Sequence, residues 1–381
     1  MPAFTSDAVR VSASPDLPLR LAAAERAAAT AMPSPDEEVW RYSRIAELDL
    51  ESFVPGHAVT TVDAPDGVAV AVGAELGDRF GTEDAIDLFH ELNNAFMDAV
   101  VISVPAGRSI SEPVIVTHRL DADGVAVFPR LVIDAAPDSE LTVVEQFLSA
   151  DGLRALCVPR LEVNVAQAAR LRYLGVNMLG NHTWQLGHQR AIGARDSTTL
   201  LATVALGGDY ARVRTEARVT GQGATTRQIA LYYADGTQMH DFRTLQDHAA
   251  PKTNSDLLFK GAVQDSAKSV YTGLIKIRHD AKGSVAFQTN RNLTLSSGAW
   301  AESVPNLDIE TNDVKCSHAS TVGPIDEEQR FYLESRGIPP EIAERLVVLG
   351  FFDEVIEQLP VGHLASQLRE MVSEKLMRRT S

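Results

Sequence analysis

Two residues in the last quarter of the chain, Cys316 and His318, carry side chains that can bind a metal. They lie two positions apart in the run DVKCSHAST. If this run is a strand, both side chains leave the same face, because successive side chains of a strand alternate between faces. A thiolate and an imidazole on one face can hold a soft or borderline metal such as iron or zinc.

Two ligands do not fill a coordination shell, so a metal at Cys316 and His318 would need further ligands. These would have to come from elsewhere in the fold or from a partner chain. The residues alone favour the plainer alternative, which is a small buried cysteine beside a hydrogen-bonded histidine.

A second group of histidines and acids lies in the run MHDFRTLQDHAAPKT, where His240 precedes Asp241 and Asp247 precedes His248. A carboxylate next to a histidine can orient the ring for a metal or for proton transfer. The same pattern is typical of a turn between strands whose polar side chains meet solvent or cap the backbone. We favour the turn.

Other polar and thiol side chains have structural interpretations. The six-residue spacing of His182 and His188 puts them on one face of a strand but too far apart for one metal. Lys260 and Lys268 can form a row that guides an anion, but a solvated strand face is the favoured interpretation. Cys157 lies in the apolar run ALCVPRLEV, which predicts a buried and inert core thiol.

The usual signatures of catalysis are missing from the sequence. It contains no GxxxxGK[ST] phosphate-binding loop, no HExxH, no CxxC and no GxSxG. A chain without these motifs is more typical of a scaffold, a binding subunit or an unusual enzyme than of a common nucleotide-dependent catalyst.

Composition and charge restrict the class of protein further. The chain has 381 residues, a net charge of -16 and two cysteines. The acidic balance argues against a nucleic-acid partner, and two cysteines are too few for a disulfide framework. The N-terminus has no apolar signal core, and no apolar stretch is long enough to span a membrane. We therefore expect a cytoplasmic protein without a membrane partner.

The chain divides into three regions with different sequence patterns, and the elements of these regions must position the residues described above. The first, residues 1–95, contains the Ala-rich run LAAAERAAATAM, which predicts a helix. In the run TEDAIDLFHELNNAF, apolar residues recur at helical spacing and Thr82 suits the helix start. The second region, residues 96–312, is a succession of short β-branched runs separated by Gly, Asp and Asn. It predicts a large sandwich, a barrel or a β-solenoid.

The third region, residues 313–381, predicts a last strand followed by a compact helical hairpin or three-helix unit. Asp326 with Gln329 resembles a capping box, and Gly337 suits the position just after the first helix. Pro340 opens a second helix in which Gly350 is a weak point. So small a helical unit leaves one apolar face without a partner, so that face must pack on the β region or on another protein.

Several of these runs together resemble the SufB/SufD family of iron–sulfur cluster assembly proteins. The most specific run is DVKCSHASTVGPIDEEQRFYLESRGI, and SDLLFKGAVQDSAKSVYTG resembles the family core. The run EEVWRYSRIAEL resembles a Trp-Arg/Lys-Tyr motif common near the start of SufD sequences. SufB-like sequences tend to carry Glu-His-Glu where this chain has Cys-Ser-His, with a cysteine upstream that is absent between Asn290 and Asp313. The SufD side of the family is therefore the closer one.

The resemblance implies a right-handed parallel β-helix core between helical N-terminal and C-terminal domains. It implies a non-enzymatic scaffold of the SUF system that pairs with SufB through the β-helix. The C-terminal helices would bind the SufC ATPase, so that ATP acts only through SufC. By motif position, His318 and its neighbour Cys316 would face SufB and hold iron or a nascent iron–sulfur cluster, transiently and shared with SufB.

Three alternatives to this interpretation stay open. The first is a purely structural adaptor with no metal role, and the second is a SufB-type paralogue. The third is a β-helix enzyme acting on polysaccharide, which would need a groove with clustered charges and usually a secretory signal.

Overall fold

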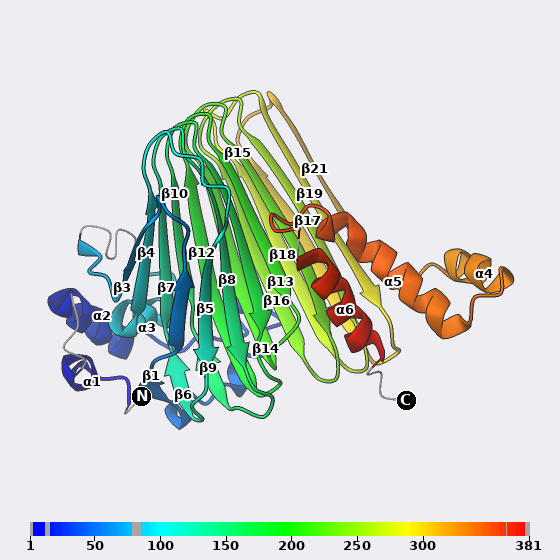
Figure 1. Ribbon diagram of the computed structural model, residues 1–381, viewed down its shortest axis with the longest axis horizontal. Coiled ribbons are helices and arrows are strands. Elements are labelled where there is room, and N and C mark those ends of the chain that lie inside the picture. Colours follow the sequence, from blue (N-terminus) through cyan, green and yellow to red (C-terminus); the bar gives the residue numbers. More distant parts are fainter. Residues whose placement is uncertain (1–2, 12–15, 78–84, 363, 378–381) are drawn as a thin grey trace.

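The computed structural model describes residues 3–11, 16–77, 85–362 and 364–377. Its body consists of two long β-sheets through which the chain winds alternately (Figure 1). Each coil contributes one strand to each sheet, and about eight coils stack into a parallel β-solenoid. The predicted β-helix is confirmed, and with it the choice between sandwich, barrel and solenoid is settled.

The first sheet has twelve strands. Nine of them lie in one row, which from one edge to the other is β20 (Trp300–Ile309), β18 (Lys268–Ile277), β16 (Met239–His248), β14 (Tyr210–Val219), β12 (Thr183–Gly193), β10 (Arg160–Val165), β7 (Pro129–Ala135), β4 (Asp98–Val104) and β3 (Ala69–Val72). Three short strands pair beside this row: β1 (Val54–Gly56), β6 (Val125–Val127) and β9 (Ala155–Cys157).

The second sheet has nine strands in the order β2 (Val59–Asp63), β5 (Val114–Leu120), β8 (Glu140–Ser149), β11 (Arg170–Met178), β13 (Thr198–Ala205), β15 (Thr225–Ala234), β17 (Asn254–Val263), β19 (Ser284–Thr294) and β21 (Val314–Gly323). All pairings in both sheets are parallel except those of β2 with β5 and of β3 with β4. Both antiparallel pairs involve an edge strand at the start of the solenoid, β2 or β3, and β20 and β21 form the last coil.

Residues of successive coils align in columns because neighbouring strands pair without offset. One inward-facing column runs through Gln228, Leu257, Gln288 and His318, on β15, β17, β19 and β21. In the first coils the inward residues are mainly aliphatic, such as Ile102, and further along they include aromatic and amide side chains. The interior is thus a packed core that ends at the last coil.

The N-terminal residues fold over the outer surface of the first sheet. They form α1 (Ser6–Val11), α2 (Leu17–Ala29), α3 (Leu88–Phe96) and three short 3-10 turns, η1 (Glu38–Trp40), η2 (Ile45–Glu47) and η3 (Leu50–Ser52). α3 starts later than predicted, because its cap is Asp87, whose carboxylate accepts the amide of His90 at 3.0 Å. The predicted start at Thr82 lies outside the described residues.

The C-terminal residues form α4 (Glu327–Ser335), α5 (Pro340–Ile356) and α6 (Leu364–Met377). Asp326 caps α4 by accepting the amides of residues 328 and 329, and Gly337 follows α4 with a φ of 85°. Both terminal signals are confirmed. Gly350 does not interrupt α5, because the second half of that helix is supported by the sheet beneath it.

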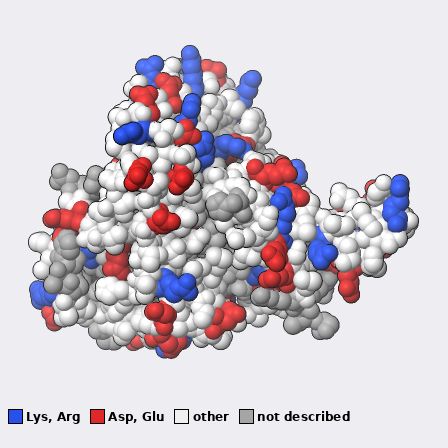
Figure 2. Space-filling view, viewed as in Figure 1, with Lys and Arg blue, Asp and Glu red and all other residues white. Residues whose placement is uncertain are grey.

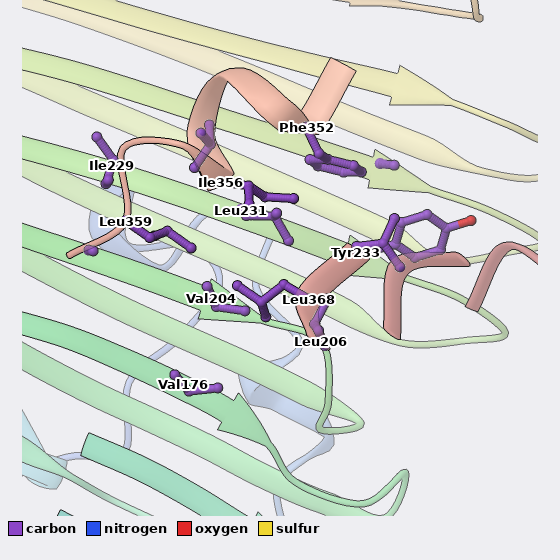
Figure 3. Packing of buried hydrophobic residues seen from close by; sticks show 14 of the residues in the cluster. Val176, Val204, Leu206, Ile229, Leu231, Tyr233, Phe352, Ile356, Leu359 and Leu368 are labelled. Carbon is purple, nitrogen blue, oxygen red and sulfur yellow. The ribbon is translucent and has the colours of Figure 1, made fainter. Parts of the chain in front are cut away.

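The second half of α5 and helix α6 pack on the outer face of the second sheet (Figure 3). Their apolar side chains meet a patch of the sheet that includes Val204, Leu206, Ile229, Leu231 and Tyr233. Lys375 of α6 adds a polar anchor, since its Nζ donates to the carbonyl of Leu206 and to the carboxylate of Asp235. In contrast, α4 has no buried residue and projects from the body (Figure 1).

In the part of the chain that the structure describes, no helix combines the length and the apolar character needed to cross a bilayer.

Candidate functional site

The last coil of the β-helix has two exposed sheet edges. β20 pairs only with β18 and β21 only with β19, and no other described strand continues either sheet at this end. Most residues of both strands are exposed or half-buried, including the apolar side chains of Leu307, Ile309 and Val322. A long uncovered edge with apolar residues is a template for pairing with another chain. This end of the solenoid is therefore suited to a partner.

Cys316 and His318 both lie on β21 and share its inward face. Cys316 aligns with Ala286 and His318 with Gln288 on the preceding coil. Cys316 is half-buried and packs against the apolar cluster that contains Ile275 and Ile277. His318 is exposed at the open end, where no described residue forms a hydrogen bond or an ion pair with it. Its imidazole is accessible to a metal or to a docking chain.

The chemistry of Cys316 depends on its proton. Burial raises the pKa of the Cys316 thiol above its usual range. The thiolate is the form that binds metals, so a metal at this cysteine must displace a proton. His318 and Cys316 together offer one nitrogen and one sulfur donor, a combination that suits iron.

The two side chains alone would not complete the coordination shell of a metal ion. Among the described residues, no group of three or more His, Cys, Asp or Glu side chains lies close enough to hold a metal ion. The neighbouring inward residue Ser320 is engaged with Ser303 of β20 through a 2.7 Å hydrogen bond. This bond ties the two edge strands together beside His318.

The prediction of a turn around His240 and His248 is wrong. Both residues lie on β16 and are buried. Burial, with a contribution from the Lys375 charge, lowers the pKa of His240 to about 3, and its Nε2 lies 3.1 Å from the carbonyl of Gly207. Burial lowers the pKa of His248 to about 4, and its ring nitrogens bond the hydroxyls of Thr253 and Ser255. Both rings are therefore neutral parts of the core at physiological pH.

Asp241, between these histidines, is the centre of a buried ionic cluster. Its carboxylate accepts hydrogen bonds from Arg212 and Arg243, which hold its pKa below the usual range although burial opposes this. The two arginines also donate to the backbone carbonyls of Val39 and Arg41. In addition, the guanidinium of Arg212 lies 4.0 Å from the ring centre of Trp40. The cluster attaches the Trp-Arg-Tyr segment to the first sheet.

Lys260 does not lie on a solvated strand face, so that prediction is also wrong. The side chain is buried on β17, and its Nζ donates to the carbonyl of Phe351 at 2.8 Å and pairs with Glu354. Lys260 therefore anchors α5 to the second sheet. Lys268 is exposed on the other sheet, which excludes a common row.

The structure also places Cys157 and the histidines His182 and His188. Cys157 is fully buried on β9, as predicted, and burial raises its pKa well above the usual value. His182 precedes β12 in a turn and only His188 lies on that strand, so the two do not share a strand face.

A second exposed surface lies on α4 and the first half of α5. Phe331 and Tyr332 of α4 are 71% and 57% exposed, and Leu346 of α5 is also exposed. Lys and Arg side chains are interspersed with Asp and Glu on the visible face of the molecule (Figure 2). An apolar and aromatic surface of this kind is typical of a protein interface.

The fold and the candidate site define a parallel β-helix protein with docked terminal helices and a Cys–His pair at its open edge. Comparison with known proteins gives the family. The model of the SUF system FeS cluster assembly SufBD core domain matches residues 118–351. This chain belongs to the SufB/SufD family.

Its relatives include an iron-sulfur cluster assembly SufBD family protein of Mycobacterium tuberculosis, 32% identical over 91% of this chain and 89% of the relative. The iron-sulfur cluster assembly protein SufD of Escherichia coli is 32% identical over 85% of this chain and 78% of its own length. SufD of Bacillus subtilis is 28% identical over 80% and 71%. These matches support the SufD side of the family, as the sequence predicted.

Proposed function

We propose that this chain is the SufD-type scaffold subunit of a cytoplasmic SUF complex and pairs with SufB through the last coil of its β-helix. The observation that carries the proposal is the open coil formed by β20 and β21, which presents His318 beside unpaired strand edges and exposed apolar side chains. A docked SufB would cover these edges and bring its own ligands to the same place. The scaffold itself catalyses no reaction.

Iron or a nascent iron–sulfur cluster is the cargo of this shared site. His318 supplies an imidazole nitrogen and Cys316 a thiolate, and SufB supplies the remaining ligands. Because this chain alone offers two donors, the shell is complete only in the complex and the cargo is held transiently. The incomplete set supports transfer, since a fully ligated site would retain its metal.

The C-terminal helices are the SufC-binding element in this proposal. Phe331 and Tyr332 on the exposed α4 provide the contact, and Lys260 and Lys375 fix α5 and α6 to the β-helix. ATP is bound by SufC alone. Closure of two SufC subunits would then twist the paired β-helices and expose the cargo site.

The pairing surface is tested by a charged substitution at each end of the solenoid. Leu307→Asp places a carboxylate on the edge strand β20 of the last coil. Val72→Asp places the same charge at an exposed apolar residue of β3, the opposite edge of the same sheet. Leu307→Asp should abolish co-purification with SufB and Val72→Asp should not. The reverse result would move the interface away from the site.

The cargo site is tested in cells that depend on the SUF system. His318→Ala should sharply reduce the activity of an iron–sulfur enzyme, whereas His279→Ala should not, because His279 is an exposed histidine outside the site. Normal enzyme activity in the His318→Ala cells, with intact co-purification of SufB and SufC, would favour the structural adaptor.

A further inference from the structure

A buried glutamine side chain lies directly behind His318, on the preceding strand. Gln288 is aligned with His318 on the preceding strand and is 2% exposed. Among the residues that the structure describes, neither its Oε1 nor its Nε2 has a hydrogen-bond partner. A buried amide that has lost its water and gained no partner destabilises the fold, so this carboxamide is unfavourable unless it gains a hydrogen bond in the working protein.

The opposite wall of the β-helix leaves space for this carboxamide. Gly273 of β18 lies against it, and a Cβ at that position would come within 2.5 Å of Nε2 and 2.7 Å of Oε1 of Gln288. The same Cβ would lie 2.3 Å from the hydroxyl of Tyr271. Any larger residue would displace the amide, so the absence of a side chain at position 273 defines where the carboxamide sits.

We propose that Gln288 is a positioning residue for His318, which rests on the proposed role of His318 as an iron ligand. Adjacent parallel strands lie about 4.8 Å apart, so a rotation of the exposed imidazole brings one ring N–H to Oε1 of Gln288. Histidine ligands almost always donate their second ring nitrogen to an acceptor of this kind, which fixes the tautomer and the ring plane. The other ring nitrogen then points to the open end.

The fold supplies a matched control in the same column of residues. Gln228 also faces inward and is 1% exposed, and its Oε1 has no hydrogen-bond partner in the described part of the chain. It lies three strands from His318, separated by Leu257 and Gln288. Gln228→Leu therefore removes a similar buried amide, at a distance of about 14 Å from His318.

The direct test is the tautomer of His318, measured by NMR on the full chain labelled with ¹⁵N-histidine, with His318→Ala to assign the signals. Gln288→Leu should change the tautomer ratio by about 3- to 10-fold, the change expected for the loss of one hydrogen bond. Gly273→Ala should act in the same direction, whereas Gln228→Leu should leave the ratio unchanged. A ratio in Gln288→Leu equal to that in Gln228→Leu would show that Gln288 bonds only buried water, and would overturn the proposal.

A second measurement separates this inference from the proposed function. The Fe²⁺ affinity of the complex with SufB should fall about 10- to 100-fold in Gln288→Leu and remain unchanged in Gln228→Leu. If His318→Ala leaves Fe²⁺ affinity unchanged while Gln288→Leu still changes the tautomer, the iron role is wrong and the positioning role stands. If both measurements are insensitive to Gln288→Leu, the positioning role is wrong.

Discussion

Phe352→Ala tests how the C-terminal helices are attached to the β-helix. Phe352 is fully buried in α5, and its ring centre lies 6.3 Å from that of Tyr233 on β15 (Figure 3). An aromatic side chain buries roughly 150–250 Å², and at about 25 cal/mol per Å² this contributes about 4–6 kcal/mol. Alanine retains part of that surface, so the expected loss is about 3–5 kcal/mol, as for other buried Phe→Ala changes.

The assay is urea denaturation followed by circular dichroism, with Phe331→Ala as the control. Phe331 is 71% exposed on α4, so its removal should change the free energy of unfolding by less than about 0.5 kcal/mol. If Phe352→Ala loses less than about 1 kcal/mol, α5 is not docked on the second sheet as described. The reasoning about the C-terminal unit would then fail.

Three further predictions follow from the same structure. Asp241→Asn leaves Arg212 and Arg243 without their buried counter-charge and should lower the free energy of unfolding by about 3–5 kcal/mol. The variant should also be cleaved early near residue 40 in limited proteolysis. Resistance to proteolysis equal to that of the wild type would contradict the role of the cluster. Burial lowers the folded-state pKa of His248 to about 4, so below about pH 6.5 the unfolded chain takes up the proton first. Lowering the pH from 7 to 5 should therefore reduce the free energy of unfolding by about 2 kcal/mol through this residue. His248→Gln should remove this part of the pH dependence, and an unchanged pH dependence in that variant would contradict the prediction. Phe331→Ala should weaken SufC binding at least about tenfold in a titration; an equal affinity would exclude α4 as the contact.

The β-rich middle of the chain could be predicted from its sequence, but its coil repeat could not. In successive coils, the corner where the chain turns from the first sheet into the second has a residue with φ near 55° to 77°. These residues recur at intervals of 27 to 31 positions. A left-handed backbone usually selects glycine, yet this corner is occupied by Asp138, Ala168, Asp196, Gly223, Lys252 and Gly283. With glycine at only some of these positions, spacing by glycine does not show the repeat.

The candidate site was partly predictable for a similar reason. The two-residue spacing of Cys316 and His318 places them on one face once the run is a strand, which is a local property. Their exposure depends on β21 being the last strand of its sheet, and no local pattern encodes that. The cluster at Asp241 was missed because its partner Arg212 comes from the preceding coil, 29 residues earlier, and is placed beside it only by strand register.

In the proposed function, an incomplete ligand set at the open coil becomes a working iron site when SufB docks. Anaerobic Fe²⁺ titration of the purified heterodimer, comparing the parent protein with His318→Ala and His279→Ala, measures this directly. We expect equal affinity for the parent and His279→Ala, and a loss of at least about tenfold in His318→Ala. Equal affinity in all three proteins would show that the imidazole at this edge does not bind the metal.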